Sequence, residues 1–563
     1  MARRPRVRDR APMTESSSSR TSGWLASGVA ALAFAAAYPA AAGATDYCVA
    51  PNTSCGGTNV ATFEQSLDLA DNAPDADRIF LGAATYTAPT TAGYSYSANS
   101  SPVEIIGAAT TETILTAPPS AFRVLFLNAG AGSSIHDLTI HLPANMAGGA
   151  NGLWLFEPAQ RVRVDEDAVQ SQAHTAVAVD GAGSFADGSV RVSTSLANEV
   201  GVRIDLGATA PTVERSSVIA ATAVAAEAPN VMLDRLTLSA TSACVEVTGG
   251  SAQVRSSLLL PIGGGTGLEA IDQGATDGSL VADGVTIVGD NSAYTTGADA
   301  SSLNAAPRSA SVVVRNSIIR GVQRSLSRFT ASNGSASVTA EYSDYDPSAT
   351  TELGSGGGAL TPLAGALAPG DNVNVDPKFV DPTSDYHLAV GSPLVDAGAP
   401  ATTQGLDLDG NQLVADGDAD GVARRDLGAY ELTAAPGGGA APSGGAVPET
   451  GTTAVDSVAP LVAGLRAAPA TFAAAVGTHF RFTLSEPARL TFRIQRASHR
   501  QHRYVTLGKF TRSRGQGANS VRFRGRIGKR ALTRGHYRVV VAASDAAGNG
   551  SIPKVARFRI VRG

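Results

Sequence analysis

The sequence predicts an all-β protein in which a right-handed parallel β-helix is followed by a β-sandwich. The first observation is a pattern that recurs between residues 79 and 345: a β-branched run, a polar corner, a second apolar pair and a glycine, as in Ala310-Ser-Val-Val-Val-Arg-Asn-Ser-Ile-Ile-Arg-Gly321. The second is the composition, 17% charged and 5% aromatic, because small and β-branched side chains suit narrow, repetitive β-structure. The third is a Gly/Pro/Ala-rich stretch that divides an acidic body from a basic C-terminal part.

The recurring runs have the spacing of a stacked repeat. One coil cannot bury its own aliphatic side chains, whereas coils stacked at about 4.8 Å pair every backbone group and form aliphatic ladders inside. A series of β-sandwiches is the alternative, and it requires turns every 8–12 residues or so. The Asp-Gly and Asn-Gly pairs at Asp180, Asp283 and Asn333 do not recur at that interval. The residues expected to point inward, roughly 18 to 33 positions apart, are Ile105, Leu138, Val169, Leu196, Val218, Leu236, Leu258, Val285 and Ile318.

Residues 1–44 predict an export signal. An arginine-rich start precedes a short apolar core, Trp24 to Ala37, and Ala42-Gly43-Ala44 is a small-x-small cleavage pattern. No later stretch reaches about 18 consecutive apolar residues, so we expect no transmembrane span in the mature chain. The mature protein is therefore expected to be secreted or held at the cell surface. In that oxidising environment a disulfide between Cys48 and Cys55 is expected, while Cys244 is interpreted as a buried apolar residue.

Residues 45–76 are expected to form an N-terminal cap on a β-helix that runs from 77 to 432. Phe63, Leu67 and Ala70 would share one face of a helix. The open end of a β-helix exposes apolar side chains and unpaired strand edges, so it must be covered.

The most specific stretch of the chain follows the coils. It contains Val375-Asp-Pro-Lys-Phe-Val-Asp-Pro, Gly391-Ser-Pro-Leu-Val-Asp-Ala-Gly398, Asp407-Leu-Asp-Gly-Asn411 and Asp426-Leu-Gly-Ala-Tyr-Glu431. This stretch resembles the C-terminal signature of pectin-lyase-like β-helix proteins of the choice-of-anchor Q type. The resemblance implies a closing coil, export and surface display, and no defined reaction. The chain departs from the pattern where an arginine is usual, because Gln412 and Leu413 stand there.

Residues 433–459 predict a flexible linker, and residues 460–563 predict a basic sandwich domain. The domain has 21 Lys/Arg against two acids, Glu486 and Asp545. This charge is interpreted either as a solubility or docking feature or as a surface for an anionic partner, such as a polysaccharide or another polyanion of the cell envelope. Nucleic acid is not expected, because the protein is exported and aromatic platforms are few.

The segments that alternate apolar and polar residues resemble strands of bacterial immunoglobulin-like domains: Phe480-Arg-Phe-Thr-Leu484, Arg489-Leu-Thr-Phe-Arg-Ile494, Val521-Arg-Phe-Arg-Gly525, Tyr537-Arg-Val-Val-Val-Ala542 and Val555-Ala-Arg-Phe-Arg-Ile-Val561.

A run of aspartates predicts a calcium site, which is the only cofactor expected. Asp416, Asp418 and Asp420 match positions 1, 3 and 5 of a calcium loop, and Gly421 matches position 6. In such a loop alternate carboxylates converge on one hard cation. The acid at position 12 is missing, because Leu427 stands there. The alternative is an acidic surface loop held by turns. The predicted ligands are Asp407, Asp409, Asp416, Asp418, Asp420 and Asp426.

No catalytic set is evident from the sequence of the coils. Acids such as those of Asp165-Glu-Asp167, Asp234 and Asp283, with arginines nearby, are interpreted as turn residues, and His136, His141 and His174 as structural or exposed. The first hypothesis is therefore a secreted or surface-attached β-helix that binds a glycan or an envelope partner. The alternative is an enzyme acting on an acidic polysaccharide, either a polysaccharide lyase, which is favoured, or a glycoside hydrolase. A purely structural spacer is a third interpretation.

Overall fold

The computed structural model describes residues 44–433 and 460–561, apart from short gaps. The export signal and the linker therefore lie outside the described residues, except for their boundary positions. Within the described part, no helix is long and apolar enough to cross a membrane. The gaps are 72–74, 98–100, 167–171, 195, 197, 274–275, 304–307, 332, 355, 359, 362–371, 401–404, 419–420, 461, 474–475, 485–486, 499–502, 528–529 and 545–553.

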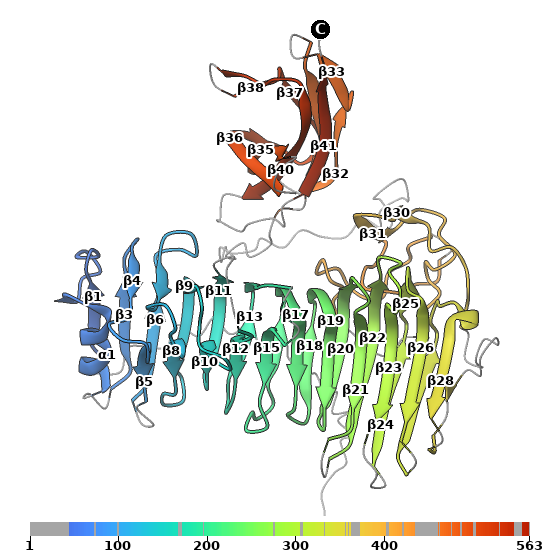
Figure 1. Cartoon of the computed structure of the whole chain (residues 1–563), viewed down its shortest axis with the longest axis horizontal. Coiled ribbons are helices and arrows are strands. Elements are labelled where there is room, and N and C mark those ends of the chain that lie inside the picture. The colour runs from blue at the N-terminus through green and yellow to red at the C-terminus, as the bar shows by residue number, and fades with distance from the viewer. Residues whose placement is uncertain are drawn as a thin grey trace, which may run out of the picture. The chain divides into compact units, whose positions relative to one another are not determined.

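The body is a parallel coil of strands, all of which belong to one 29-stranded sheet among the described residues (Figure 1). The pairings divide the coil into three faces, called here sheets 1, 2 and 3. Sheet 1 contains β1 (Asp46–Val49), β2 (Thr58–Val60), β3 (Asp77–Leu81), β6 (Val103–Ile106), the first parts of β9 (Ser134–Leu142) and β11 (Pro158–Glu166), β13 (Ser184–Ala186), β16 (Thr212–Glu214), β18 (Val231–Asp234), the first parts of β20 (Ser251–Pro261) and β22 (Gly278–Val288), β24 (Ser309–Arg315), β27 (Ser335–Glu341) and β29 (Leu360–Thr361).

The other two faces are built in the same way. Sheet 2 contains β4 (Thr85–Thr87), β7 (Ile114–Thr116), the second parts of β9, β11, β20 and β22, β14 (Ser189–Arg191), the first parts of β17 (Ser217–Ala226) and β19 (Thr237–Thr248), and β25 (Ile318–Arg320). Sheet 3 contains β5 (Tyr94–Tyr96), β8 (Arg123–Leu127), β10 (Asn151–Leu155), β12 (Thr175–Val179), β15 (Val200–Ile204), the second parts of β17 and β19, β21 (Thr266–Ile271), β23 (Thr296–Ser302), β26 (Arg324–Thr330) and β28 (Thr350–Gly354). The predicted parallel β-helix is confirmed.

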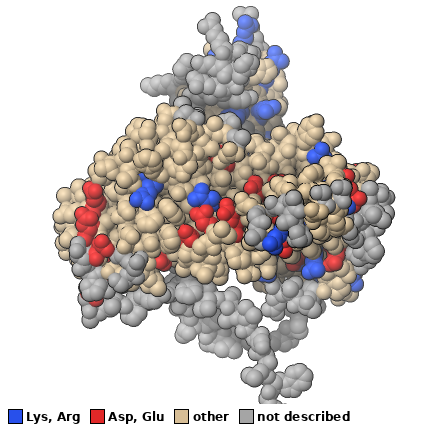
Figure 2. All heavy atoms as spheres, turned by 60° about the horizontal axis from the view of Figure 1, so that its bottom comes forward, with Lys and Arg blue, Asp and Glu red and all other residues tan. Residues whose placement is uncertain are grey.

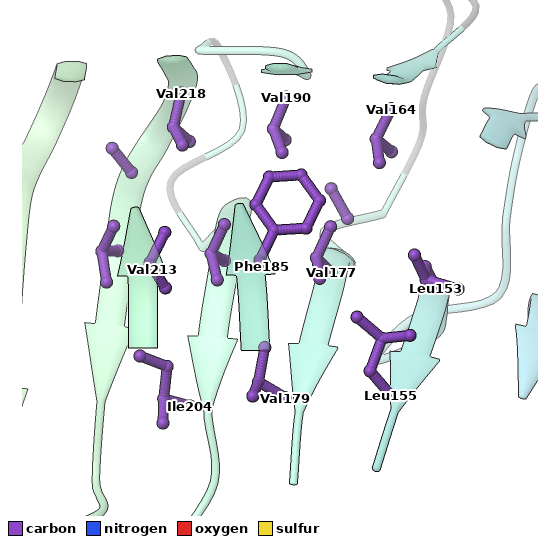
Figure 3. Close-up of a cluster of buried hydrophobic side chains, with 14 of the residues drawn as sticks. Leu153, Leu155, Val164, Val177, Val179, Phe185, Val190, Ile204, Val213 and Val218 are labelled. Atoms are coloured by element: carbon purple, nitrogen blue, oxygen red, sulfur yellow. The ribbon is translucent and has the colours of Figure 1, made fainter. Parts of the chain in front are cut away.

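The interior is a set of aliphatic ladders, as stacking requires. Leu153, Val177 and Val202 pair in register on sheet 3, and all three are fully buried. Phe185 of sheet 1 fills the space between the faces, as Figure 3 shows. Each rung adds about 4.8 Å, so like side chains meet at van der Waals distance along the axis.

The structure corrects the phase of two expected inward positions. Leu259 and Ile319 point into the core, while Leu258 and Ile318 are their outward neighbours, with Ile318 packed in a separate cluster outside the coil. Side chains along a strand alternate between inward and outward. Where two aliphatic residues are adjacent, the sequence does not show which of them points inward, so the strand register decides. Leu196 is only half-buried. Val169 lies outside the described residues, whereas the remaining positions of the predicted series lie in the core.

The corner between sheets 1 and 2 carries a series of charged pairs. One residue per coil adopts a left-handed backbone there, and these residues pair across coils: Arg161 with Asp137 at 2.6 Å, and Arg215 with Asp187 at 2.6 Å. Asn316 has φ 49° and donates to Asp283 at 2.6 Å. Figure 2 shows one face of the molecule, on which some acidic and basic groups adjoin on a mostly uncharged surface. The interpretation of these acids as turn residues therefore agrees with the geometry.

The N-terminal end is covered by α1 (Phe63–Asp71). Its buried residues include Phe63, Leu67 and Ala70, and the ring of Phe63 lies 4.7 Å from that of Tyr94 in an edge-to-face contact. The range predicted for the cap, 45–76, also contains β1, which pairs with β3 as a strand of sheet 1. A short strand next to an open sheet edge satisfies its backbone hydrogen bonds in this way.

The segment from 372 to 432 folds back along the outside of sheet 2. Val373 extends the coil by one bridge to Asp344, and then β30 (Phe379–Asp381) and β31 (Asp385–Leu388) form a hairpin. Arg425 donates to both oxygens of Asp283 at 3.1 Å, and the segment buries an apolar cluster that includes Leu394 and Ile318. The expected closing coil is thus mostly a side cover, because outward apolar residues such as Ile318 need burial as much as the coil end does.

The C-terminal part is a two-sheet β-sandwich, as predicted. Its two faces bury phenylalanines and aliphatic residues between them, among them Phe480, Phe492 and Val539. One sheet contains β32 (Val462–Ala468), β34 (Thr478–Leu484) and β37 (Gly517–Phe523). The other contains β33 (Thr471–Ala473), β41 (Lys554–Val561), β40 (Gly535–Ser544), β35 (Ala488–Ser498) and β36 (Arg503–Arg514), and β38 (Arg526–Ile527) pairs with β39 (Arg530–Ala531).

Candidate functional site: the outer face of sheet 3

A single outward row on sheet 3 gathers the side chains best suited to bind a ligand. Each member stands between two inward ladder residues of its strand, so the pleat turns it to the outside. Strand pairing places the members in register on eight successive strands, and we call them the outer row. From the N-terminal side they are Phe126, Trp154, Ala178, Arg203, Ala225, Glu246, Glu269 and Asp299.

The N-terminal end of the outer row is aromatic. The ring centroids of Phe126 and Trp154 lie 5.2 Å apart, and Phe156 lies 5.7 Å from Phe126 and 6.1 Å from Trp154. The guanidinium of Arg123 stands over the Phe126 ring at 4.8 Å. These rings are half-buried, so part of their apolar surface faces solvent. Such a surface can stack with the C–H face of a sugar ring.

The other end of the outer row is acidic. Glu246, Glu269 and Asp299 lie on consecutive strands, which places their backbones about 4.8 Å apart per layer. Burial, together with the charges of Glu246 and Asp299, raises the pKa of Glu269 to about 8. Burial also raises the pKa of Glu246, against the opposing effect of a hydrogen bond from Thr248. Glu269 therefore holds a proton at neutral pH.

Arg203 separates the aromatic end from the acidic end. Its Nε donates to Asp205 at 2.7 Å and its Nη1 to Thr175 at 3.1 Å. Its second terminal nitrogen lies 3.4 Å from the side-chain oxygen of Asn151. The guanidinium is thus held in place by three partners, and its strand neighbours in the outer row are the small residues Ala178, which is fully buried, and Ala225.

This arrangement can bind an extended polymer and can perform acid-base chemistry. A carboxylic acid that is protonated near neutral pH is a general acid, and a second carboxylate about 5 Å away is the spacing of retaining glycoside hydrolases. One rung of a β-helix separates the backbones of Glu246 and Glu269 by about 4.8 Å. The outer row therefore combines a stacking surface, a fixed cation and paired carboxyl groups.

The structure does not bring the six predicted calcium ligands together. Asp407 is buried and accepts from the backbone of Asn411 at 2.6 Å and of Glu431 at 2.8 Å. Asp426 accepts from the backbone of Asp396 at 2.8 Å, and burial raises its pKa to about 7. Asp409 pairs with His387 at 2.7 Å. These three carboxyl groups already make hydrogen bonds or an ion pair within the segment. Buried acceptors need such partners within the fold. Asp420 lies outside the described residues.

Two predicted ligands do lie together, with a third that the sequence did not indicate. Asp416 and Asp418 have carboxylate oxygens within 4.8 Å of each other and of the buried Asp396. The Oδ2 of Asp396 accepts from the amides of Gly417 and Asp418, and its Oδ1 from Arg424 at 3.1 Å. Only Oδ1 therefore has a lone pair left for a cation. The three groups fit calcium in part, so the calcium site stays a prediction.

Calcium titration tests that site. If it binds, adding calcium to the chelated protein is expected to raise Tm by a few degrees, and Asp416→Asn should remove most of that rise. Scanning calorimetry with and without calcium measures both. Magnesium serves as the control, since it requires a stricter octahedral geometry. An unchanged Tm at millimolar calcium would exclude the site.

The remaining candidate acids and histidines of the coils lie in ion pairs. Asp165 binds His141 at 2.8 Å and Arg163 at 2.7 Å. Asp234 pairs with Arg235 at 2.8 Å. His136 lies between Glu104 at 3.1 Å and Asp137 at 2.7 Å. All of these pairs are at least partly exposed. Asp283 pairs with Arg425, whereas Glu166 and His174 belong to a buried cluster, and Asp167 lies outside the described residues.

Sequence reasoning missed the acidic members of the outer row. The signal was present as an acid between two apolar residues in three successive coils: Val245-Glu246-Val247, Leu268-Glu269-Ala270 and Ala298-Asp299-Ala300. The acids are 23 and 30 residues apart, so no fixed spacing links them. Only the strand register shows that they stack.

The strand pairing defines the class of protein: the chain is a parallel β-helix protein with a C-terminal β-sandwich. No known protein family and no curated protein matches it. Among solved structures it is similar to the pectin methylesterase of Aspergillus niger, with 9% identity, a TM-score of 0.23, and 61% of this chain and 94% of that chain covered. It is also similar to the A-module of the mannuronan C-5 epimerase AlgE4 of Azotobacter vinelandii, with 11% identity, a TM-score of 0.27, and 56% and 96% covered. A third similar structure is the enzymatically active domain of tailspike protein 2 of bacteriophage CBA120. It has 10% identity and a TM-score of 0.27, with 90% of this chain and 74% of that chain covered. At these values the similarities carry no argument about function.

Proposed function

We propose that this protein is exported and binds a polysaccharide along the outer face of sheet 3. The observation that carries the proposal is the outer row itself, in which aromatic rings, a fixed arginine and three acids follow one line over eight strands. At about 4.8 Å per layer this line is about 30 Å long, which suits an extended chain of several sugar units. The disulfide between Cys48 and Cys55, with a Cα–Cα distance of 5.6 Å, supports an oxidising compartment.

The charge of the outer row favours an uncharged polysaccharide. Glu246 and Asp299 would repel the carboxylates of a polyuronate at close range, whereas Glu269 is protonated at neutral pH and carries no charge. Their oxygens are good acceptors for the hydroxyl groups of neutral sugars. A neutral glycan therefore fits the acidic end better than the acidic polysaccharide expected from the sequence.

The sandwich offers a different surface, which we assign to an anionic polymer of the cell envelope. Arg512, Arg522, Arg524 and Lys509 line a hollow of about 400 Å³ next to Phe510. The guanidinium of Arg512 stands 5.4 Å from the Phe510 ring. Exposed cations attract polyanions at long range. Surface display, which the choice-of-anchor Q resemblance implies, agrees with such a partner.

Binding to immobilised glycans tests both surfaces in one experiment. The full chain is passed over neutral polysaccharides, such as glucans and mannans, and over anionic ones, such as teichoic acid and polygalacturonate. Trp154→Ala is expected to weaken retention on the neutral polymer at least about fivefold, because a stacked ring contributes about 1–3 kcal/mol. The double variant Arg512→Ser/Arg522→Ser should weaken retention on the anionic polymer alone, in a salt-dependent manner.

The matched control is Phe379→Ala. Phe379 is also half-buried and lies 5.5 Å from Tyr386 in an edge-to-face contact, but it belongs to the segment on sheet 2. This variant should bind both polymers as the native chain does. Equal losses for Trp154→Ala and Phe379→Ala, or no retention on any neutral polymer, would refute binding by the outer row.

Hydrolysis of the bound glycan is the second candidate function. The raised pKa of Glu269, between Glu246 and Asp299, favours it over the lyase chemistry suggested by the sequence. The expected result is release of new reducing ends from a neutral polysaccharide, and loss of that release in Glu269→Gln. Glu112→Gln, at an exposed turn, is the control. Retention of a polymer without any new reducing ends would leave the outer row as a binding surface only.

A further inference from the structure

A buried cluster of three ligating side chains lies at the corner between sheets 2 and 3, apart from the outer row. Glu166 ends β11, His174 immediately precedes β12 in the same coil, and Glu199 immediately precedes β15 in the next coil. The register of Thr175 with Val200 places His174 directly beside Glu199. One ligating atom from each side chain lies within 4.8 Å of the others.

The cluster is closed to solvent. The side chains of His174 and Glu199 have 0% exposure, and that of Glu166 has 7%. The His174 Nε2 lies 2.9 Å from Glu199 Oε1 and 3.4 Å from Glu166 Oε2. Neither contact has hydrogen-bond geometry. Five buried atoms of this cluster have no hydrogen-bond partner among the described residues: Glu166 Oε2, His174 Nδ1, His174 Nε2, Glu199 Oε1 and Glu199 Oε2.

Such a set of unsatisfied buried atoms is costly by itself. A buried acceptor without a partner costs on the order of 1–3 kcal/mol, and more if it is charged. With an imidazolium and two carboxylates the cluster would carry a net negative charge in a dry corner. A divalent cation bound to neutral imidazole and two carboxylates makes the cluster neutral and satisfies three of these atoms at once.

The two contacts of His174 agree with ligands around one ion. Zinc binds imidazole nitrogen at about 2.0–2.1 Å and carboxylate oxygen at about 2.0–2.2 Å. Two ligand atoms at about 2.1 Å from one ion are about 3.0 Å apart at a right angle and about 3.4 Å apart at a tetrahedral angle, from the same bond lengths. The observed separations of 2.9 and 3.4 Å fall at these values.

We propose that Glu166, His174 and Glu199 form a structural site for a first-row divalent metal ion, such as zinc, that ties two successive coils together. The donor set of one imidazole and two carboxylates is typical of zinc, manganese and iron sites. The burial of all three ligands excludes a polymeric substrate, so the ion stabilises the corner. The site is independent of the outer row and of any catalysis there.

Metal analysis of the full chain tests the proposal. The protein is purified without a polyhistidine tag, stripped with a chelator and titrated with zinc, and bound metal is measured by mass spectrometry. We expect about one tightly bound zinc per chain and a higher Tm in the loaded protein. Cobalt bound in place of zinc should give a visible absorption band whose intensity reports the coordination.

Two ligand variants and two controls assign the site. His174→Gln and Glu199→Gln should each weaken zinc binding by more than the 10–100-fold or so that an outer-shell change costs. His141→Gln changes a half-buried histidine that pairs with Asp165, and Asp416→Asn changes the acidic cluster near Asp396; both should bind zinc as the native chain does. If the ligand variants do not fold, the proposal is tested on the native chain alone, by comparing its Tm with and without metal. An unchanged Tm together with no retained zinc, manganese or iron overturns the proposal, as does equal binding by native chain and His174→Gln.

Discussion

Replacing Phe185 by alanine is expected to lower the free energy of unfolding by about 3–5 kcal/mol, the range measured for large aromatic deletions in cores. The Phe185 side chain is fully buried and stands among Val177, Val190 and Val213 from all three faces (Figure 3). A narrow coil has no spare side chain to refill the space, so most of the cavity should persist. Urea denaturation followed by far-UV circular dichroism measures the change.

Phe122→Ala is the matched control for this prediction. The same atoms are removed, but Phe122 is 63% exposed, so the change should stay within about 0.5 kcal/mol. A loss below about 1 kcal/mol for Phe185→Ala would show that its ring does not fill the interior as described. A similar loss in both variants would point to an effect on the unfolded chain.

Glu269→Gln is expected to stabilise the protein at alkaline pH and to change little at pH 5. The pKa of Glu269 is raised from its ordinary value to about 8 by burial and by the neighbouring acids. A raised carboxyl pKa means that the folded state binds the proton more tightly than the unfolded state. That contribution to stability is complete below about pH 4.5 and is lost as pH rises through about 8.

The size of the effect follows from the same linkage. Allowing for solvent screening of a half-buried group, the native chain should lose on the order of 2 kcal/mol more than Glu269→Gln between pH 5 and pH 9. Urea denaturation of both proteins at the two pH values measures the difference. Glu112→Gln, at an exposed turn, should follow the native chain. Parallel losses in the native chain and Glu269→Gln would mean that Glu269 is ionised throughout, and the acid role proposed for it would fall.

The outer row and the metal-binding corner show why the candidate sites could not be predicted from the sequence. Val245-Glu246-Val247 and Leu268-Glu269-Ala270 each read as one strand with an outward acid. Whether two such acids stack depends on the lengths of the intervening turns and on the hydrogen-bond register. The partners of His174 are even harder to predict, because Glu166 and Glu199 lie in different coils. A lone histidine among apolar residues gave no reason to connect them.

The sequence by itself determined the coil and the sandwich. Aliphatic residues that recur once per turn can leave water only by stacking, and alternating strands rich in phenylalanine can do so only by pairing two faces. The tertiary structure alone decided which of Leu258 and Leu259 points inward, where residues 385–432 pack, and which acids share a row. The physical reason is that burial requires an aliphatic residue per rung but not a particular one, whereas a site requires particular side chains at one register. Register is set by cooperative backbone hydrogen bonding along the whole coil, and no local stretch of sequence contains it.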